Sequence, residues 1–203
     1  MAEPFSFLIL AGGKSRRMGR PKAELPWGEG TFLDACVVKG LQLGAAEVLL
    51  SGPFTHPSAR TVPDIVRDIG PLGGISACLR ASATEVAAVL SVDTPQVPAS
   101  LYQAMLEAFP PAAHCLMLYC GGYYEPLISL FRRSALPRLE QAVEQGIYSV
   151  VRAVEPLGIT PFFYTGDPAK IRGCNTPEEY FRFQKNQIPP EKSSKIVNFD
   201  VKT

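Results

Sequence analysis

Residues 5–13 read F-S-F-L-I-L-A-G-G, and this segment indicates the fold class more directly than any other stretch of the chain. A run of six residues that is apolar except for Ser6 is typical of a strand buried on both faces of a sheet. The run stops at Ala11, and the two glycines that follow let the backbone turn sharply. We therefore expect a buried strand over residues 5–10 that leads directly into a loop.

The apolar pattern further along the chain alternates between the periods of strand and helix. Strands are expected over residues 47–51, 61–66, 86–92, 115–119 and 126–131. Helices are expected over residues 31–43, 73–81, 100–109 and 132–145. Strands that alternate with helices indicate an α/β protein with a parallel sheet.

The length of 203 residues accommodates one domain. We expect this domain to cover residues 1–185 and to end in a helix that begins at N-T-P-E-E over residues 175–179. There Thr176 can cap the helix, Pro177 occupies its first position, and the two glutamates face its positive end. Residues 186–203 mix prolines, lysines and serines with one weak apolar stretch, so we expect a mobile tail.

Charge and cysteine usage exclude several classes of protein. A formal net charge of +1 supplies no broad positive field, so no nucleic-acid partner is expected. No apolar run reaches the length of about eighteen residues that a membrane helix needs. Five cysteines without a C-x-x-C pair, and Glu3 where a signal peptide carries basic residues, predict reduced thiols in a cytoplasmic protein.

The loop after the first strand continues as K-S-R-R-M-G-R-P-K over residues 14–22 and carries five cations. Such a loop, with glycine amides close by, suits a polyphosphate. A solvated basic loop is the simpler interpretation of the cluster alone, but α/β sheets bind ligands where their strands end. Neither a Walker loop nor the G-x-G-x-x-G fingerprint is present, so a nucleotide would be held in another way.

Two carboxylates follow in loops of the same kind. Asp68 opens D-I-G-P-L-G-G-I, where a carboxylate suits the N–H donors of guanine; an ordinary helix cap explains it equally well. Asp93 follows the strand over residues 86–92 and precedes Thr94 and Pro95. One carboxylate there is enough to hold Mg²⁺ on a triphosphate, although a strand-end Asp taken alone is more often a cap.

These three segments, in this order and spacing, resemble the molybdenum cofactor guanylyltransferase family. Its pattern is L-A-G-G-x-S-x-R-M-G with a lysine shortly after, then G-P-L-x-G, D-x-P and a late N-T-P, and the resemblance covers residues 5–185. It implies a single-domain nucleotidyltransferase fold, a Rossmann-like and mostly parallel sheet with helices on both faces. It also implies transfer of GMP from GTP to molybdenum-molybdopterin, with Mg²⁺ and with release of pyrophosphate.

The resemblance assigns roles to individual residues. It implies catalytic roles for Arg17, Lys22 and Asp93, with the metal held by Asp93. It implies nucleotide contacts from these two groups of residues: the backbone of Leu10, Ala11, Gly12 and Gly13, and the side chains of Lys22, Ser51, Asp68 and Asp93. A contact with a molybdoenzyme or with another protein of cofactor biosynthesis is the further partner that it suggests.

The sequence departs from the family pattern at two positions. Ser51 stands where many members have asparagine, and Gly173 replaces the first asparagine of N-x-N-T-P. Asn175 is then the remaining candidate on the acceptor side. Glu125 could line the acceptor pocket, but a surface carboxylate is the simpler interpretation. Tyr119, Tyr123 and Tyr124 are better explained by packing than by stacking on a pterin.

Three alternative functions remain open at this level. A cytidylyltransferase of the same fold is the nearest, although A-G-G at residues 11–13 leaves more space for a purine than the L-A-A-G typical of enzymes that use CTP. A non-catalytic carrier of the cofactor would bind nucleotide or pterin without forming pyrophosphate. A sugar-phosphate nucleotidyltransferase is weaker, because the late N-T-P helix start fits it poorly.

Overall fold

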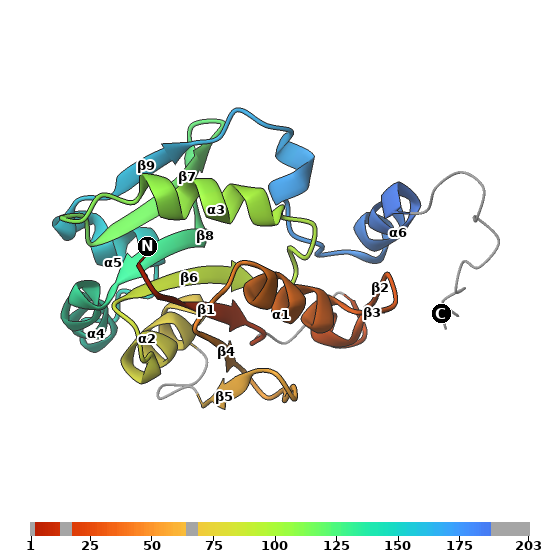
Figure 1. The fold of residues 1–203 in the computed structure, drawn as a ribbon, viewed down its shortest axis with the longest axis horizontal. Coiled ribbons are helices and arrows are strands. Elements are labelled where there is room, and N and C mark those ends of the chain that lie inside the picture. Colours follow the sequence, from red (N-terminus) through yellow and green to blue (C-terminus); the bar gives the residue numbers. More distant parts are fainter. Residues whose placement is uncertain (1–2, 13–17, 64–68, 188–203) are drawn as a thin grey trace.

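A seven-stranded sheet forms the centre of the molecule (Figure 1). The computed structural model describes residues 3–12, 18–63 and 69–187. The strands lie in the order β5-β4-β1-β6-β8-β7-β9. Only β8 runs antiparallel to its neighbours, and the other strand pairs of this sheet are parallel. The strands are β1 (Phe5–Leu10), β4 (Glu47–Ser51), β5 (Arg60–Val62), β6 (Val86–Ser91), β7 (Cys115–Cys120), β8 (Tyr123–Arg132) and β9 (Thr160–Phe163).

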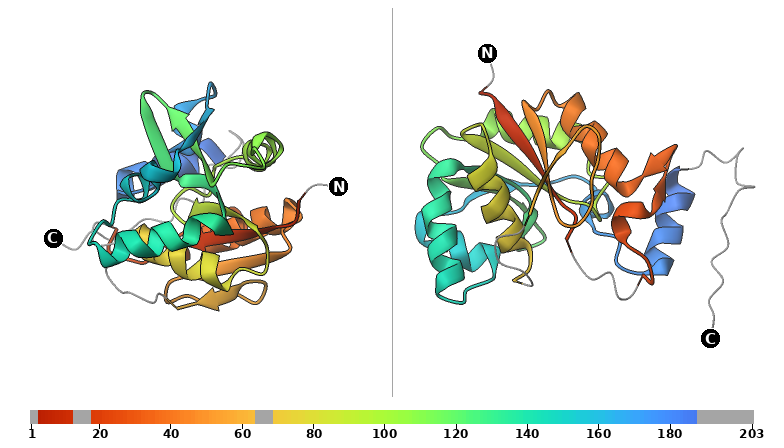
Figure 2. Two further views of the ribbon diagram at one scale, coloured as in Figure 1. Left: turned by 90° about the vertical axis from the view of Figure 1, so that its left-hand side faces the viewer. Right: turned by 90° about the horizontal axis from the view of Figure 1, so that it is seen from below.

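Helices cover both faces of the sheet, as Figures 1 and 2 show. Alternate residues of β1 point to opposite faces because side chains alternate along a strand. Phe7 and Ile9 pack with α1 and α3, whereas Leu8 and Leu10 pack with α2, α4 and α5. The expected α/β fold with a mostly parallel sheet is therefore confirmed. The helices are α1 (Phe32–Gln42), α2 (Pro71–Ala81), α3 (Ala99–Ala108), α4 (Leu136–Glu144), α5 (Val150–Val154) and α6 (Pro177–Gln187).

The order of the strands creates a switch point between β1 and β6. From β1 the chain passes through α1 to β4 on one side, and it later returns through α2 to β6 on the other side. Loops that leave adjacent strands in opposite directions open a crevice at their carboxyl ends. A ligand-binding crevice is therefore expected between the loop after Leu10 and the loop after Ser91, because the topology places these two loops side by side.

A small hairpin and the last helix pack together beside α1, as Figures 1 and 2 show. The hairpin consists of β2 (Pro26–Trp27) and β3 (Gly30–Thr31). The ring of Trp27 contacts Phe32 of α1 edge to face at 5.4 Å and Phe183 of α6 at 6.2 Å. Tyr180 is 1% exposed, and its hydroxyl donates to the carbonyl of Pro26 at 3.0 Å. These contacts fix the start of α6 against the segment that carries Lys22.

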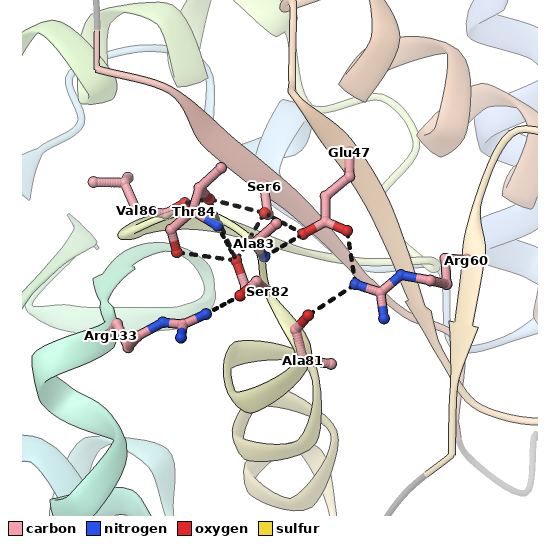
Figure 3. A network of polar contacts seen from close by, with 9 residues as sticks. All are labelled: Ser6, Glu47, Arg60, Ala81, Ser82, Ala83, Thr84, Val86 and Arg133. Carbon is pink, nitrogen blue, oxygen red and sulfur yellow. Dashed lines mark hydrogen bonds and ion pairs between the residues drawn. The ribbon is translucent and has the colours of Figure 1, made fainter.

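A polar network ties the amino ends of the strands together (Figure 3). Glu47 at the start of β4 accepts from Ser6 of β1 at 2.9 Å, from the amide of Ala83 at 2.6 Å and from Arg60 of β5 at 2.7 Å. Arg133 donates to the carbonyl of Ser82. The network lies at the edge of the sheet opposite to the crevice, so it stabilises the fold without occupying the candidate site.

Most expected elements are present, with shifted ends. β1 and β4 have the expected bounds, and α1 begins after Thr31, whose side chain forms a capping box with Asp34. The expected helix over residues 132–145 is wrong at its start, because Arg132 still pairs with Val86 as the last residue of β8. The helix α4 begins only at Leu136, where Pro137 occupies its first turn.

Other boundaries differ by smaller amounts, and some predictions fall outside the described residues. α2 begins at Pro71, because Gly70 takes a left-handed φ of 74° just before it. β5 ends at Val62, and residues 64–66 of the strand expected there lie outside the described residues. α6 extends to Gln187, beyond the predicted domain end at residue 185. Of the predicted mobile tail, residues 188–203 also lie outside the described residues.

Candidate active site

Three neighbouring strands end at the same level of the sheet. Leu10, the last residue of β1, pairs with Ser51 of β4 on one side and with Ser91 of β6 on the other. The Ala11 amide donates to the carbonyl of Ser51 at 2.8 Å, and the Val92 amide donates to the carbonyl of Leu10 at 3.0 Å. The sheet ladder thus continues one residue beyond the strands, so the loops beginning at Gly12 and Asp93 leave from adjacent, fixed positions.

Two glycines allow close packing at the carboxyl ends of β1 and β4. Gly52 has a φ of +125°, and a Cβ there would lie 2.9 Å from the carbonyl carbon of Ala11 and from the amide nitrogen of Gly12. Gly74 of α2 lies against Ser51, because a Cβ at residue 74 would stand 2.4 Å from the Ser51 Oγ. Ser51 is buried and Gly12 is exposed. The Gly12 backbone is therefore accessible at the carboxyl end of β1, whereas the Ser51 side chain is covered by α2.

Lys22 joins the two loops of the crevice. Its Nζ lies 2.8 Å from Oδ2 of Asp93 and donates to Oδ1 of Asn175 at 2.7 Å. The side chains of Lys22 and Asp93 keep exposed fractions of 17% and 18%. The two residues predicted to meet at one triphosphate are thus in direct contact, although 71 positions separate them in the sequence. Their shared role at a triphosphate stays a prediction.

Residues 172–175 cross the loop that carries Asp93. The Cys174 amide donates to the carbonyl of Asp93 at 2.8 Å, and the Gln96 side chain donates to the carbonyl of Arg172. A Cβ at Gly173 would lie 3.0 Å from the Asp93 Oδ2. Because residue 173 is a glycine, the Asp93 carboxylate can lie directly against its backbone. This is the position at which the sequence lacks the first asparagine of the family pattern.

The start of α6 fixes Asn175 in place. Thr176 and Glu179 form a capping box: the Glu179 amide donates to Thr176 Oγ1 at 3.2 Å, and the Thr176 amide donates to the Glu179 carboxylate at 3.0 Å. The Asn175 amide also donates to this carboxylate at 2.6 Å, and its side chain donates to the carbonyl of Gly173 at 3.2 Å. The predicted cap at Thr176 is confirmed, and it orients Asn175 toward Lys22.

Cys174, which lies between Gly173 and Asn175 in the sequence, carries an uncharged thiol. Cys174 is fully buried, and burial raises its pKa to about 12, although the nearby Lys22 acts in the opposite direction. Its Sγ lies 3.9 Å from the carbonyl of Thr176. A thiol with this pKa is protonated at neutral pH, so Cys174 offers no thiolate nucleophile to a substrate.

An aromatic cluster lies on the strands beyond β6. Tyr119 packs edge to face against Tyr124 at 5.0 Å and against Phe163 at 5.6 Å. Tyr123, the first residue of β8, remains exposed. Burial raises the pKa of the neighbouring Glu125, with Arg172 acting in the opposite direction. The ring contacts agree with the packing explanation for Tyr119 and Tyr124, and the charge of Arg172 reaches Glu125 from the segment that crosses Asp93.

Three predicted site residues lie outside the described part of the chain: Gly13, Arg17 and Asp68. Lys14 and Arg16 of the basic loop lie outside it as well. The described residues that sequence reasoning missed are Gly173, for its contact with Asp93, and Lys39 on α1. The sequence contains one indication of Lys39. It follows Phe32 and Cys36 at helical spacing, so it lies on the apolar face of the helix, where a lysine is unexpected.

All five cysteines lie within the described residues, and none of them forms a disulfide bond. In the part of the chain that the structure describes, no three His, Cys, Asp or Glu side chains come together as a metal site. No helix there has the length and apolar character needed to cross a bilayer.

Known proteins share both the sequence pattern and the fold. Residues 7–157 match the MobA-like NTP transferase domain. A molybdenum cofactor guanylyltransferase of Pseudomonas aeruginosa is 34% identical over 184 residues, which cover 86% of this chain and 92% of the relative.

Two solved structures show the same fold at lower identity. Molybdopterin-guanine dinucleotide biosynthesis protein A from Archaeoglobus fulgidus has a TM-score of 0.72 at 22% identity, covering 89% of this chain and 97% of that one. Rv0371C from Mycobacterium tuberculosis, in complex with manganese, has a TM-score of 0.64 at 16% identity, covering 90% and 98%. The domain match over most of the chain and the identity to the Pseudomonas protein together establish that the chain belongs to the MobA-like NTP transferase family.

Proposed function

We propose that this chain is a molybdenum cofactor guanylyltransferase, which transfers GMP from GTP to molybdenum-molybdopterin and releases pyrophosphate. The observation that carries the proposal is the contact of 2.8 Å between Lys22 and Asp93 at the switch point of a family that uses nucleoside triphosphates. The name and length of the 34% identical relative support the same reaction. The acceptor phosphate would attack the α-phosphorus of GTP, and the bond to the β-phosphate would break as pyrophosphate leaves.

Lys22 is proposed to bind the phosphates of GTP. Its ammonium group has two oxygen partners in Asp93 and Asn175, and the Lys22 side chain as a whole is 17% exposed. A cation held in this way neutralises charge on the leaving group without a large reorganisation of the site. Arg17 is proposed to act with it on the phosphates, as the family pattern implies.

Asp93 fits a divalent cation that is held jointly with the triphosphate, and we propose Mg²⁺. The hydrogen bonds of the described residues engage only Oδ2 of this carboxylate, so Oδ1 is left to bind a metal. Mg²⁺ is commonly held by one or two carboxylates together with phosphate oxygens and waters, so one aspartate is enough. When bound, the metal would neutralise part of the negative charge that develops on the departing pyrophosphate.

The remaining predicted contacts concern the nucleoside and the acceptor. The backbone of Leu10, Ala11, Gly12 and Gly13 is proposed to pack against the nucleotide, and Ser51 and Asp68 are proposed to bind its guanosine part. Asn175 is proposed to contact the acceptor, because it lies beside Lys22 on the segment that crosses Asp93. The chain is further proposed to work in the cytoplasm and to pass its product to a molybdoenzyme or to another protein of cofactor biosynthesis.

The transfer is proposed to be direct, without a covalent intermediate on the protein. The neutral, buried thiol of Cys174 is a poor nucleophile at neutral pH. Catalysis then consists of positioning two anionic substrates and neutralising the charge that builds between them. This is work that Lys22 and Asp93 can perform from their observed positions.

Pyrophosphate release tests this proposal. The purified chain is incubated with molybdenum-molybdopterin, Mg²⁺ and either GTP, CTP or ATP, and release with GTP alone is expected. Preference for CTP would favour a cytidylyltransferase, and nucleotide binding without release of pyrophosphate would favour a carrier.

Lys22→Ala and Asp93→Asn should each lower the rate of pyrophosphate release about 100-fold, or ~3 kcal/mol, without unfolding the chain. Lys170→Ala, which removes an exposed lysine, is the matched control. Near-normal transfer by both site variants would overturn the assignment of roles.

A further inference from the structure

A lysine is buried beneath the loop that carries Asp93. Lys39 lies on α1 and is 7% exposed, and its Nζ donates to the carbonyl of Pro95 at 2.7 Å. Among the described residues no carboxylate forms an ion pair with it. The side chain thus reaches from the core of the domain to the main chain of the loop over residues 93–95.

The same face of α1 contacts both sides of Asp93. The Sγ of Cys36, one turn before Lys39, lies 4.0 Å from the carbonyl of Val92. Lys39 holds the carbonyl of Pro95, and within the loop the amide and hydroxyl of Thr94 both donate to the carbonyl of Ser91, at 3.1 and 2.8 Å. The carbonyl before Asp93 and the carbonyl two residues after it are therefore both held, and Lys39 is the charged group that holds the second one.

The position of Lys39 is unfavourable for stability. Moving an ammonium group out of water is costly unless its charge is compensated, and a single neutral carbonyl compensates little of it. Burial accordingly lowers the pKa of Lys39, although the Cys36 thiol acts in the opposite direction. Methionine is similar to lysine in length, and an apolar side chain would fill this site without the desolvation cost. The benefit of the lysine must then lie in what its hydrogen bond holds.

We infer that Lys39 is a positioning residue for Asp93: by holding the Pro95 carbonyl it fixes the loop, so that the carboxylate meets Lys22 and the substrate metal in one orientation. The inference rests on the proposed role of Asp93. Lys22 binds the carboxylate from the crevice, and Lys39 holds the main chain of the same loop from the core.

The test separates a positioning role from a structural one. Lys39→Met removes the desolvation cost of the ammonium group but leaves the Pro95 carbonyl without this donor, so its unfolding temperature should stay close to that of the parent chain. Its kcat for pyrophosphate release should fall about tenfold, with the KM for GTP nearly unchanged. Binding of Mn²⁺ in the presence of GTP, followed by electron paramagnetic resonance, should weaken several-fold. Lys170→Met serves as the matched control and should change none of these values.

Two results would overturn the inference. Full activity and normal Mn²⁺ binding by a stable Lys39→Met variant would show that the loop does not need the lysine. A lower unfolding temperature, with activity lost in proportion to unfolding, would show that Lys39 is structural. Asp93→Asn is measured in parallel: if it retains full activity, the proposed site itself is wrong, whereas an inactive Asp93→Asn with a fully active Lys39→Met rejects only the role of Lys39.

Discussion

Gly173 lies directly against the carboxylate of Asp93, because a Cβ at residue 173 would stand only 3.0 Å from the Asp93 Oδ2. The Cys174 amide holds this arrangement through its hydrogen bond to the Asp93 carbonyl. The carboxylate that is proposed to bind the metal therefore has its place defined by a residue 80 positions later in the sequence.

Gly173→Ala should displace the Asp93 carboxylate and reduce catalysis. The added methyl group would lie 3.0 Å from Oδ2, so the carboxylate must shift by a few tenths of an ångström, and we expect kcat/KM for pyrophosphate release to fall several-fold. Gly40→Ala provides the contrast, since its Cβ would lie 2.8 Å from the ring of Phe7 in the core. That variant should lose stability and keep its kcat. Unchanged activity of Gly173→Ala would show that catalysis does not depend on the exact position of the Asp93 carboxylate.

Tyr180 should support both stability and catalysis, because it anchors the helix that follows Asn175. Tyr180→Phe removes the hydrogen bond to Pro26 and should cost about 1 kcal/mol of unfolding free energy. Tyr180→Ala also removes the ring contact with Phe32 and should cost about 3 kcal/mol.

Transfer activity checks the second part of this prediction. At a temperature where both Tyr180 variants remain folded, Tyr180→Ala should show the larger loss, because Asn175 is no longer held beside Lys22. If the two variants and the parent chain were equally active, the anchoring of α6 would not matter for catalysis.

Cys174→Ala should keep its transfer activity. The raised pKa of the buried thiol, about 12, leaves it protonated at pH 7 to 8, so iodoacetamide should also alkylate it slowly in the folded chain. Peptide mass spectrometry after timed alkylation measures this, with the less buried Cys120 as the internal comparison. An inactive but folded Cys174→Ala variant would point to a covalent intermediate and against direct transfer.

Glu47 should make the fold sensitive to acid. Burial alone would raise its pKa, but the hydrogen bonds from Ala83, Arg60 and Ser6 outweigh it and hold the pKa below the ordinary value of 4.5. A carboxylate whose pKa is lower in the folded chain than in the unfolded chain stabilises the fold at every pH above its pKa in the unfolded chain. This stabilisation is lost as the pH falls through the pKa in the folded chain.

Glu47→Gln should therefore be less stable by about 2 kcal/mol at pH 7, and the difference should shrink below pH 4.5. Urea unfolding at several pH values measures it, with Glu29→Gln at an exposed position as the control. A difference that does not depend on pH would assign the stabilisation to packing rather than to charge.

The central part of the fold could be predicted from sequence because its strands are continuous apolar runs. β1 and β6 have no polar face, and such strands require helices on both sides. β9 was missed because it has four residues and contains Pro161, which is tolerated at the edge of a sheet but weakens the pattern. The hairpin of β2 and β3 has two residues in each strand, too few for any periodicity.

The candidate site could be predicted only in part. Lys22 and Asp93 were expected to meet because each follows a strand that ends at the same edge, and local sequence carries that information. The contact of Gly173 with Asp93 and the reach of Lys39 to Pro95 depend on tertiary packing between distant segments. No local pattern encodes such pairs. The roles of Gly13, Arg17 and Asp68 remain predictions from the sequence.

The most direct test of the account is a crystal structure of the chain with GTP and Mg²⁺. The account predicts that one triphosphate lies in the crevice between β1 and β6, with the metal bound to the Asp93 carboxylate and the Lys22 ammonium in contact with a phosphate oxygen. A nucleotide whose phosphates lie away from both residues, with the Lys22–Asp93 pair left as it is here, would contradict it.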